Sequence, residues 1–388
     1  METLEEEQST ETADRLTNIS WPTEIIEEIV SRLPVKSIIR FRSVSKPWLS
    51  LISDPSFTKL HSTRATAALF LSAYDPSTEN HYFFSAPHAG GPVAHLMTLG
   101  NTRPADITKA EHLNGLVFIS AKTFSSGYFQ AFVINPSRRK IFELPPPDSN
   151  PNLTSGYIRL YVFGFDESRN EHKIVLITQF FRPAKLEVMI YSLSNHSWRK
   201  IDVEPPIGYS WDRFSYHGPS SVCINSVIHS MFLESTFWKL DFLAFDLRTE
   251  KFSVISIPQG VVPRFFLEIN GCVGFVCHDL DLKNNEFYIW ILQDYDDNRV
   301  LVRKTVEFPE SWIEALERSS PPPLDAVNMD EFVISSSKVS GNVMSVPVYN
   351  KKTGCSKSLQ FTFGHLVPCS ETLQLDQIRF YIESMESL

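Results

Sequence analysis

A short hairpin pattern that recurs along the chain limits its fold more than any other feature of the sequence. Each copy contains an aromatic or aliphatic residue, a polar turn, a basic residue and a further apolar residue. The copies are INPSRRKIFEL from Ile134, YSLSNHSWRKI from Tyr191, FDLRTEKFSVI from Phe245 and YNKKTGCSKSL from Tyr349, with a longer variant, WILQDYDDNRVLVRK, from Trp290. The four copies are 57, 54 and 104 residues apart, and the longer variant fills the last interval, which is close to two periods. A repeat of about 45–55 residues is typical of propeller blades with four strands each.

The region from about Thr66 onward has the alternating pattern of strands. Runs such as KIVLIT and EFYIWIL are separated by clusters of Asn, Asp, Gly, Pro and Ser. We therefore predict an all-β, propeller-like domain over residues 65–388, with about six to seven blades. AALFLS near its start and IRFYIES near its end are expected to share the blade that closes the ring. The alternative is a sandwich of unrelated hairpins.

The preceding residues have a different period. Residues 1–18 are acidic and polar, so disorder is predicted there. Residues 19–64 are predicted to form a small all-α domain of three short helices, in WPTEIIEEIVSRL, in VKSIIRFR and from about Ser43, with a further turn starting at DPSF. Pro34 ends the first helix because proline cannot continue it. Three short helices cannot bury so many large aliphatic side chains among themselves, so part of this surface is expected to bind another protein.

Composition and charge exclude several classes of function. The net charge of −9 argues weakly against nucleic-acid binding, and no apolar run approaches the ~18 residues of a membrane span. The N-terminus lacks a secretory signal, so cytoplasm or nucleus is the expected location. Residues 32–64 hold seven Lys or Arg against the single Asp54. This local excess of positive charge suits an acidic partner.

The sequence contains no motif of a familiar catalytic or cofactor site. A glycine-rich phosphate loop and a nucleophile elbow are both absent. Cys272, Cys277 and His278 form part of a metal-binding pattern but lack a second pair of ligands nearby in sequence. The five cysteines are irregularly spaced, which favours free thiols over disulfides. No cofactor, no metal and no catalytic residue are predicted, although a propeller-fold hydrolase remains an alternative.

One segment of the repeat region, IGYSWDRFSYHG, concentrates the residue types that dominate protein-recognition surfaces. Tyr, Trp and Arg bury a large area at low entropic cost. The same alternation would also suit a strand packed within a blade. The candidate substrate-binding residues are Tyr209, Trp211, Arg213, Phe214 and Tyr216.

The segment WPTEIIEEIVSRLPVKSIIRFRSVSKPWLSLISDPSF, from Trp21 to Phe57, closely resembles an F-box of the form found in plant F-box proteins. The strand-rich remainder resembles the F-box associated domain that follows such motifs in plants. Two positions depart from the common F-box pattern: Trp21 replaces a usual Leu and Ser45 replaces a usual Cys. The first exchange adds bulk, and the second changes little volume.

This resemblance implies a substrate-recognition subunit of an SCF-type ubiquitin ligase. The helical domain would bind a Skp-type adaptor and, through it, a cullin and a RING subunit, while the β domain would bind a protein substrate. No catalytic side chain is then needed, because the assembly acts by proximity. A non-degradative F-box scaffold is the alternative within this family. Carried onto this sequence, the adaptor contacts fall on Pro22, Ile26, Ile29, Leu33, Pro34, Val35, Ile38, Val44 and Trp48.

Overall fold

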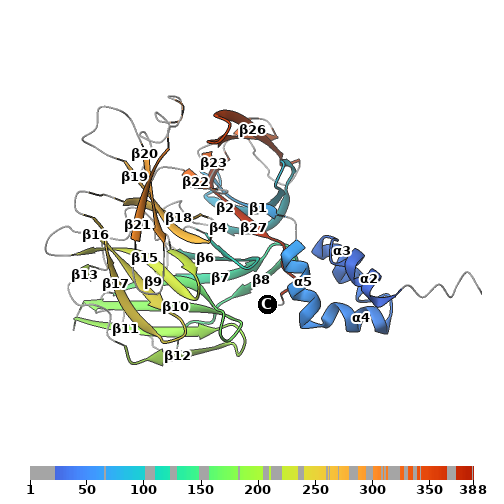
Figure 1. The fold of residues 1–388 in the computed structure, drawn as a ribbon, viewed down its shortest axis with the longest axis horizontal. Helices are drawn as coiled ribbons and strands as arrows, with labels where there is room; N and C mark the ends of the chain where they lie inside the picture. Colours follow the sequence, from blue (N-terminus) through green and yellow to red (C-terminus); the bar gives the residue numbers. More distant parts are fainter. Residues whose placement is uncertain are drawn as a thin grey trace, which may run out of the picture. The chain divides into compact units, whose positions relative to one another are not determined.

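The protein divides into two compact units, and each is described by itself (Figure 1). The computed structural model describes residues 22–64, 67–100, 110–122, 129–147, 157–181, 184–203, 209–210, 221–234, 240–258, 261, 263–269, 271–278, 287–293, 300–306, 309, 312, 324–326, 331–334, 339–340, 342–364, 373–386 and 388. Of these, the helical unit contains residues 22–64 and Glu383–Glu386, and the β unit contains the rest.

The helical unit has one helix more than the sequence predicts. Its helices are α2 (Thr23–Val30), α3 (Val35–Phe41), α4 (Lys46–Ser53) and α5 (Pro55–Arg64). The expected turn at DPSF continues as α5. Asp54 starts it by accepting a hydrogen bond from the N–H of Ser56 at 2.8 Å, and a proline is well tolerated in the first helical turn.

The breaks between the helices follow from local chemistry. Pro34 lies in an extended conformation between α2 and α3, where it ends the first helix and begins the next. Ser45 begins α4, since its hydroxyl accepts a hydrogen bond from the N–H of Trp48 at 3.4 Å. Pro47 is tolerated because it falls in the first turn, where its missing N–H costs nothing. The predicted helix boundaries therefore lie close to the observed ones.

The β unit is a propeller with six blades. Within the described residues, strand pairing defines six sheets. The innermost strands of the six sheets are neighbours in the order β27, β5, β9, β14, β18 and β22. The predicted all-β propeller is thus confirmed, and its blade number is six.

The blades follow one another along the chain. The first complete blade consists of β5 (Glu111–Leu113), β6 (Leu116–Lys122), β7 (Phe129–Asn135) and β8 (Lys140–Glu143). The second consists of β9 (Tyr157–Asp166), β10 (Glu171–Phe181), β11 (Ala184–Ser192) and β12 (Ser197–Ile201). The third consists of β13 (Tyr209–Ser210), β14 (Ser221–Ile224), β15 (Val227–Glu234), β16 (Leu240–Asp246) and β17 (Lys251–Ser256).

The last three blades complete the ring. The fourth consists of β18 (Pro263–Ile269), β19 (Cys272–His278), β20 (Phe287–Gln293) and β21 (Val300–Val306). The fifth consists of β22 (Leu324–Ala326), β23 (Glu331–Ile334), β24 (Val339–Ser340), β25 (Val343–Asn350) and β26 (Cys355–Thr362), joined by β3 (Gly91–Pro92). The closing blade consists of β27 (Gln374–Ile382), β1 (Ala67–Asp75), β2 (Asn80–Pro87) and β4 (Ala94–Gly100).

The two ends of the β unit share the closing blade, as the sequence predicts. β1 pairs antiparallel with β27, and Ala67 lies opposite Ile382 at the end of this ladder. One blade therefore combines three strands from the start of the domain with one strand from its end. This arrangement removes the open edges that an unclosed ring would have.

The recurring sequence pattern corresponds to a repeated four-residue hairpin turn. An Asp or Asn at the end of one strand accepts hydrogen bonds from backbone N–H groups of the turn, as Asp246 does from Arg248 at 2.8 Å. The fourth residue after this position adopts a positive φ, which lets the chain re-enter the sheet. Among the described residues, five such turns follow an Asp or Asn and place Glu79, Arg139, Asn170, Glu250 or Gly354 in this position; a sixth has Ser192 instead of the Asp or Asn and places His196 there.

Contacts between the second and third blades are unusually close. A Cβ atom on Gly164 of β9 would lie 2.6 Å from Leu247 Cδ1 and 2.7 Å from Ile228 Cδ1, so a larger residue there would require these two side chains to shift. Nearby, the buried Lys173 pairs with the buried Asp166 at 2.6 Å. The Lys173 ammonium also donates to the carbonyl of Leu247 at 3.3 Å, which ties the second blade to a turn of the third.

Candidate protein-interaction site

The helical unit leaves several large aliphatic side chains uncovered. Its small core contains Val30, Ile38, Ile52 and Phe57. Outside this core, Ile29 on α2 is 56% exposed and Val44, in the turn between α3 and α4, is 62% exposed. Ile25 and Leu49 are also exposed. Aliphatic side chains in such positions gain free energy when a partner covers them, at roughly 25 cal/mol per Å² of apolar area.

The nine residues predicted to contact an adaptor fall into three groups by exposure. Four of them are exposed: Pro22, Ile29, Pro34 and Val44. Three are partly buried: Ile26, Leu33 and Trp48. The exposed group is directly available to a partner. The partly buried group contributes to the core and presents only part of its surface.

The remaining two residues, Val35 and Ile38, are fully buried, so the prediction that they contact an adaptor is corrected. Both have an exposed fraction of 0%, so neither contacts a partner in this conformation. Ile38 belongs to the core of the helical unit, and Val35 begins the same inward face of α3. Helical spacing identifies an apolar face, but it does not say whether that face meets the rest of the unit or a partner.

Two exposed residues were missed by the sequence analysis. Ile25 lies four positions before Ile29 on α2, so the two side chains share one face of that helix. This i, i+4 relation was the available signal for Ile25. Leu49 follows Trp48 on α4 and has no such signal.

Trp48 is held mainly by its own unit. Its ring centroid lies 5.0 Å from that of Phe41, with the rings tilted by 46°. Aromatic pairs at this distance stabilise the packing beyond the area that they bury. Trp48 therefore packs against the core of the helical unit and presents only part of its side chain to a partner.

Positive charge predominates in residues 32–64 of the helical unit, whereas α2 carries three glutamates. Glu28 pairs with Arg32 at 2.6 Å and with Arg64 at 2.7 Å, and these hydrogen bonds lower the pKa of the Glu28 carboxyl. Lys36, Arg40 and Lys46 are exposed and form no ion pair with the described residues. The part of the helical unit after α2 is thus basic, which suits an acidic protein.

The residues predicted to bind substrate lie almost wholly outside the described part of the chain. Tyr209 begins β13 and pairs with Glu234 through the backbone. Trp211, Arg213, Phe214 and Tyr216 lie outside the described residues. The assignment of this segment to substrate recognition therefore stays a prediction.

The innermost strands of three blades meet around one buried carboxyl group. Glu111 on β5 accepts hydrogen bonds from the N–H of Phe163 on β9, at 2.8 Å, and from the hydroxyl of Ser221 on β14, at 2.5 Å. Burial raises the pKa of Glu111 to about 8, although these hydrogen bonds oppose the shift. This carboxyl group therefore holds its proton more strongly than an exposed glutamate does.

Burial also shifts the pKa values of the neighbouring titratable groups. Burial lowers the pKa of His112 to about 3, and its ring accepts a hydrogen bond from the N–H of Gly115 at 3.1 Å. Burial raises the pKa of the Cys223 thiol to about 12. Hydrogen bonds from Phe163 and Ser221 to Glu111, and from the N–H of Phe165 to Cys223 Sγ, join the inner strands of neighbouring blades. These groups therefore contribute to the packing of the inner strands.

Replacing Glu111 is expected to change how the stability of the β unit depends on pH. A carboxyl whose pKa is raised on folding stabilises the fold below its unfolded pKa, near 4.5, and loses this contribution as pH rises through about 8. In wild type, Glu111 should make the unfolding free energy fall by about 1–3 kcal/mol between pH 5 and pH 8. In Glu111→Gln this fall should be absent, as measured by urea denaturation at each pH. Glu143→Gln, an exposed glutamate of the same blade, is the control. An equal slope in wild type and Glu111→Gln would contradict this role.

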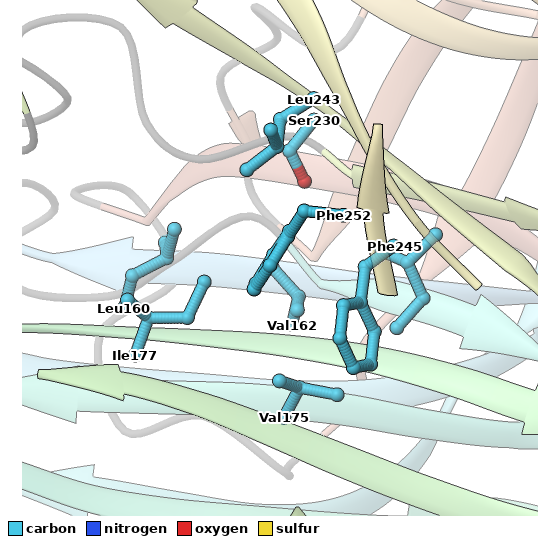
Figure 2. A pocket seen from close by; sticks show the side chains of 9 residues that line it. Leu160, Val162, Val175, Ile177, Ser230, Leu243, Phe245 and Phe252 are labelled. Atoms are coloured by element: carbon cyan, nitrogen blue, oxygen red, sulfur yellow. The ribbon is translucent and has the colours of Figure 1, made fainter. Parts of the chain in front are cut away.

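A small gap between the second and third blades is lined almost entirely by apolar side chains. Figure 2 shows Leu160, Val162, Val175 and Ile177 facing residues of β15, β16 and β17, with the hydroxyl of Ser230 directed inward. Apart from that hydroxyl, no polar group lines the gap. Since catalysis needs several convergent polar groups, this gap is a packing feature of the interface between the blades.

Two further types of site are not found among the described residues. No helix in this part of the chain is long and apolar enough to cross a membrane. No group of three or more His, Cys, Asp or Glu in the described segments is arranged to hold a metal ion. Cys272 and Cys277 both lie on β19.

Comparisons with known proteins agree with this architecture. Residues 19–60 match the F-box domain and residues 68–368 match the F-box associated beta propeller domain. The F-box protein DOR of Arabidopsis thaliana is 28% identical over 311 residues, which cover 76% of this chain and 76% of that protein. The F-box protein At4g22390 of the same plant is 25% identical over 323 residues, covering 77% of each.

Among solved structures, TolB from Acinetobacter baumannii is similar, with a TM-score of 0.47 and 10% identity, over 82% of this chain and 66% of that chain. This similarity is too low to support an argument. The match to the F-box associated beta propeller domain, in contrast, extends over more than half of the chain. The chain therefore belongs to the family of plant F-box proteins with a C-terminal F-box associated beta propeller domain.

Proposed function

We propose that this protein is the substrate-recognition subunit of an SCF-type ubiquitin ligase. In this proposal the helical unit binds a Skp-type adaptor, which connects it to a cullin and a RING subunit, and the β unit binds a protein substrate. The observation that supports it most directly is the uncovered aliphatic surface of a unit that matches the F-box domain. Ile29 and Val44 lie outside the core of that unit, so a bound partner accounts for their exposure.

The mechanism of such a subunit is proximity. Holding a substrate near a ubiquitin-conjugating enzyme raises their effective concentration to about the millimolar range when the connection spans the distance. The subunit itself then needs no catalytic residue. The matches to the F-box domain and to the F-box associated beta propeller domain support this role over that of a propeller-fold hydrolase.

The substrate-binding part and the location are further components of the proposal. We assign substrate recognition to the β unit, with the aromatic segment from Ile207 to Gly218 as the first region to test. The protein acts in the cytoplasm, the nucleus or both, where the other subunits of such a ligase would meet it.

The proposal is tested by assembly from purified components. The full-length protein, a Skp-type adaptor, a cullin and a RING subunit are mixed, and their complex is measured by size-exclusion chromatography with light scattering. Stable assembly that depends on the adaptor is the expected result. If the protein elutes alone at micromolar concentrations of the adaptor, the proposal is wrong.

A second measurement separates the ligase from a non-degradative scaffold. Partners captured by the β unit are followed in cells with and without the protein, and their half-lives are compared. A shorter half-life in the presence of the protein supports substrate recognition for degradation. An unchanged half-life, with adaptor binding intact, favours the scaffold.

A further inference from the structure

The helical unit contains a segment from the opposite end of the chain. Glu383–Glu386 follow the last strand of the propeller and belong to the helical unit. Within this segment, Met385 packs against the core formed by Val30, Ile38, Ile52 and Phe57. The core of a domain predicted to lie entirely within residues 19–64 is therefore completed by a residue more than three hundred positions away.

A polar contact joins the same segment to the start of α3. The carboxylate of Glu383 accepts a hydrogen bond from the N–H of Val35 at 2.9 Å. Pro34, which precedes α3, has no side chain that can accept this hydrogen bond. The first N–H groups of a helix have no partner within the helix, so Glu383 supplies one from outside. Its negative charge also suits the positive end of the helix dipole.

Closure of the propeller brings the start and the end of the β unit together at one blade. Ala67, shortly after α5, lies opposite Ile382 in the ladder between β1 and β27. The two chain connections between the helical unit and the β unit therefore leave from paired positions of one blade.

We propose that Glu383 and Met385 are positioning residues for adaptor binding: the C-terminal segment holds α3 in place and thereby shapes the surface that carries Ile29 and Val44. This inference depends on the proposed function. The segment contacts inward-facing residues and leaves Ile29 and Val44 exposed at 56% and 62%. The segment therefore completes the core of the helical unit and leaves the exposed aliphatic residues available to an adaptor.

The experiment uses the full-length protein and two independent measurements. Met385→Ala and Glu383→Gln are compared with wild type by amide hydrogen exchange of residues 35–41 and by affinity for a purified Skp-type adaptor. Met97→Ala is the matched control, since Met97 is a partly buried methionine of the closing blade. We expect exchange in α3 to quicken about tenfold or more in Met385→Ala and about threefold in Glu383→Gln. Adaptor affinity should weaken about three- to tenfold in Met385→Ala.

Each outcome bears on the proposal. Unchanged exchange of α3 in both variants overturns it, whether or not the adaptor binds. Faster exchange with unchanged adaptor affinity also overturns the positioning role, because the segment would then serve stability alone. Tighter adaptor binding would overturn it by showing that the segment covers the site. If wild type fails to bind the adaptor while α3 responds as expected, the proposed function is wrong and the placement of the segment is still supported.

Discussion

Ile29→Asp combined with Val44→Asp is expected to weaken binding of the full-length protein to a Skp-type adaptor by about a hundredfold or more. Each change places a charge where an apolar contact is buried in the complex, and a loss of about 1.4 kcal/mol per site already gives this factor. Since both side chains are largely exposed, the variant should fold normally. Isothermal titration calorimetry gives the affinity, and circular dichroism reports the fold.

The β unit offers a matched control for this experiment. Ile141 on β8 and Val343 on β25 are also exposed aliphatic residues, at 41% and 36%. Ile141→Asp combined with Val343→Asp adds the same charges to the same residue types and should leave adaptor affinity within about twofold. If both double variants bind as wild type does, the exposed surface of the helical unit is not the adaptor site.

Asp166→Ala is expected to lower the unfolding free energy of the β unit by about 3–5 kcal/mol at neutral pH. Asp166 and Lys173 are both buried, with exposed fractions of 0% and 1%, so the variant leaves an ammonium group inside the protein without its counter-charge. Burial alone would raise the pKa of Asp166, but hydrogen bonds from Lys173 and Ser168 outweigh it and hold this pKa below its ordinary value. Urea denaturation followed by circular dichroism measures the loss.

An exposed ion pair of the same blade serves as the comparison for Asp166→Ala. Lys200 pairs with Glu187 at 2.9 Å, but the lysine side chain is 56% exposed. Lys200→Ala should therefore cost less than about 1 kcal/mol. Acidification adds a second test, because a lowered carboxyl pKa stabilises the fold above its unfolded pKa, near 3.8, and this contribution disappears as pH falls below it. Equal costs for the two variants would show that the Lys173 ammonium gains solvent when Asp166 is removed.

Several features of the fold are local and could be predicted from short stretches of sequence. Pro34 ends α2 wherever the helix lies, because a proline ring cannot accommodate a continuing helix. Asp246 and its counterparts in the other blades form tight turns through hydrogen bonds to backbone groups two or three residues away. The regular spacing of these turns made a propeller predictable, and the apolar pattern at both ends of the β region predicted the closing blade.

The candidate site was predictable only in part. Composition identified a helical unit with more apolar surface than it could bury, and Ile29 and Val44 are indeed exposed. The resemblance to an F-box placed Val35 and Ile38 among the adaptor contacts, whereas both are buried. An apolar side chain facing a core and one facing a partner obey the same period, so the pattern cannot separate them.

The sequence by itself determined the features that arise between near neighbours: where helices start and stop, which residues form the hairpin turns, and that a small helical unit precedes a β propeller. Tertiary structure decided the contacts between distant positions. Met385 in the helical core, Glu383 at the start of α3 and Glu111 among three blades all join segments far apart in the chain. The apolar pattern of the sequence does not predict such contacts, because they depend on how the folded helices and strands pack together and on which groups this packing removes from water.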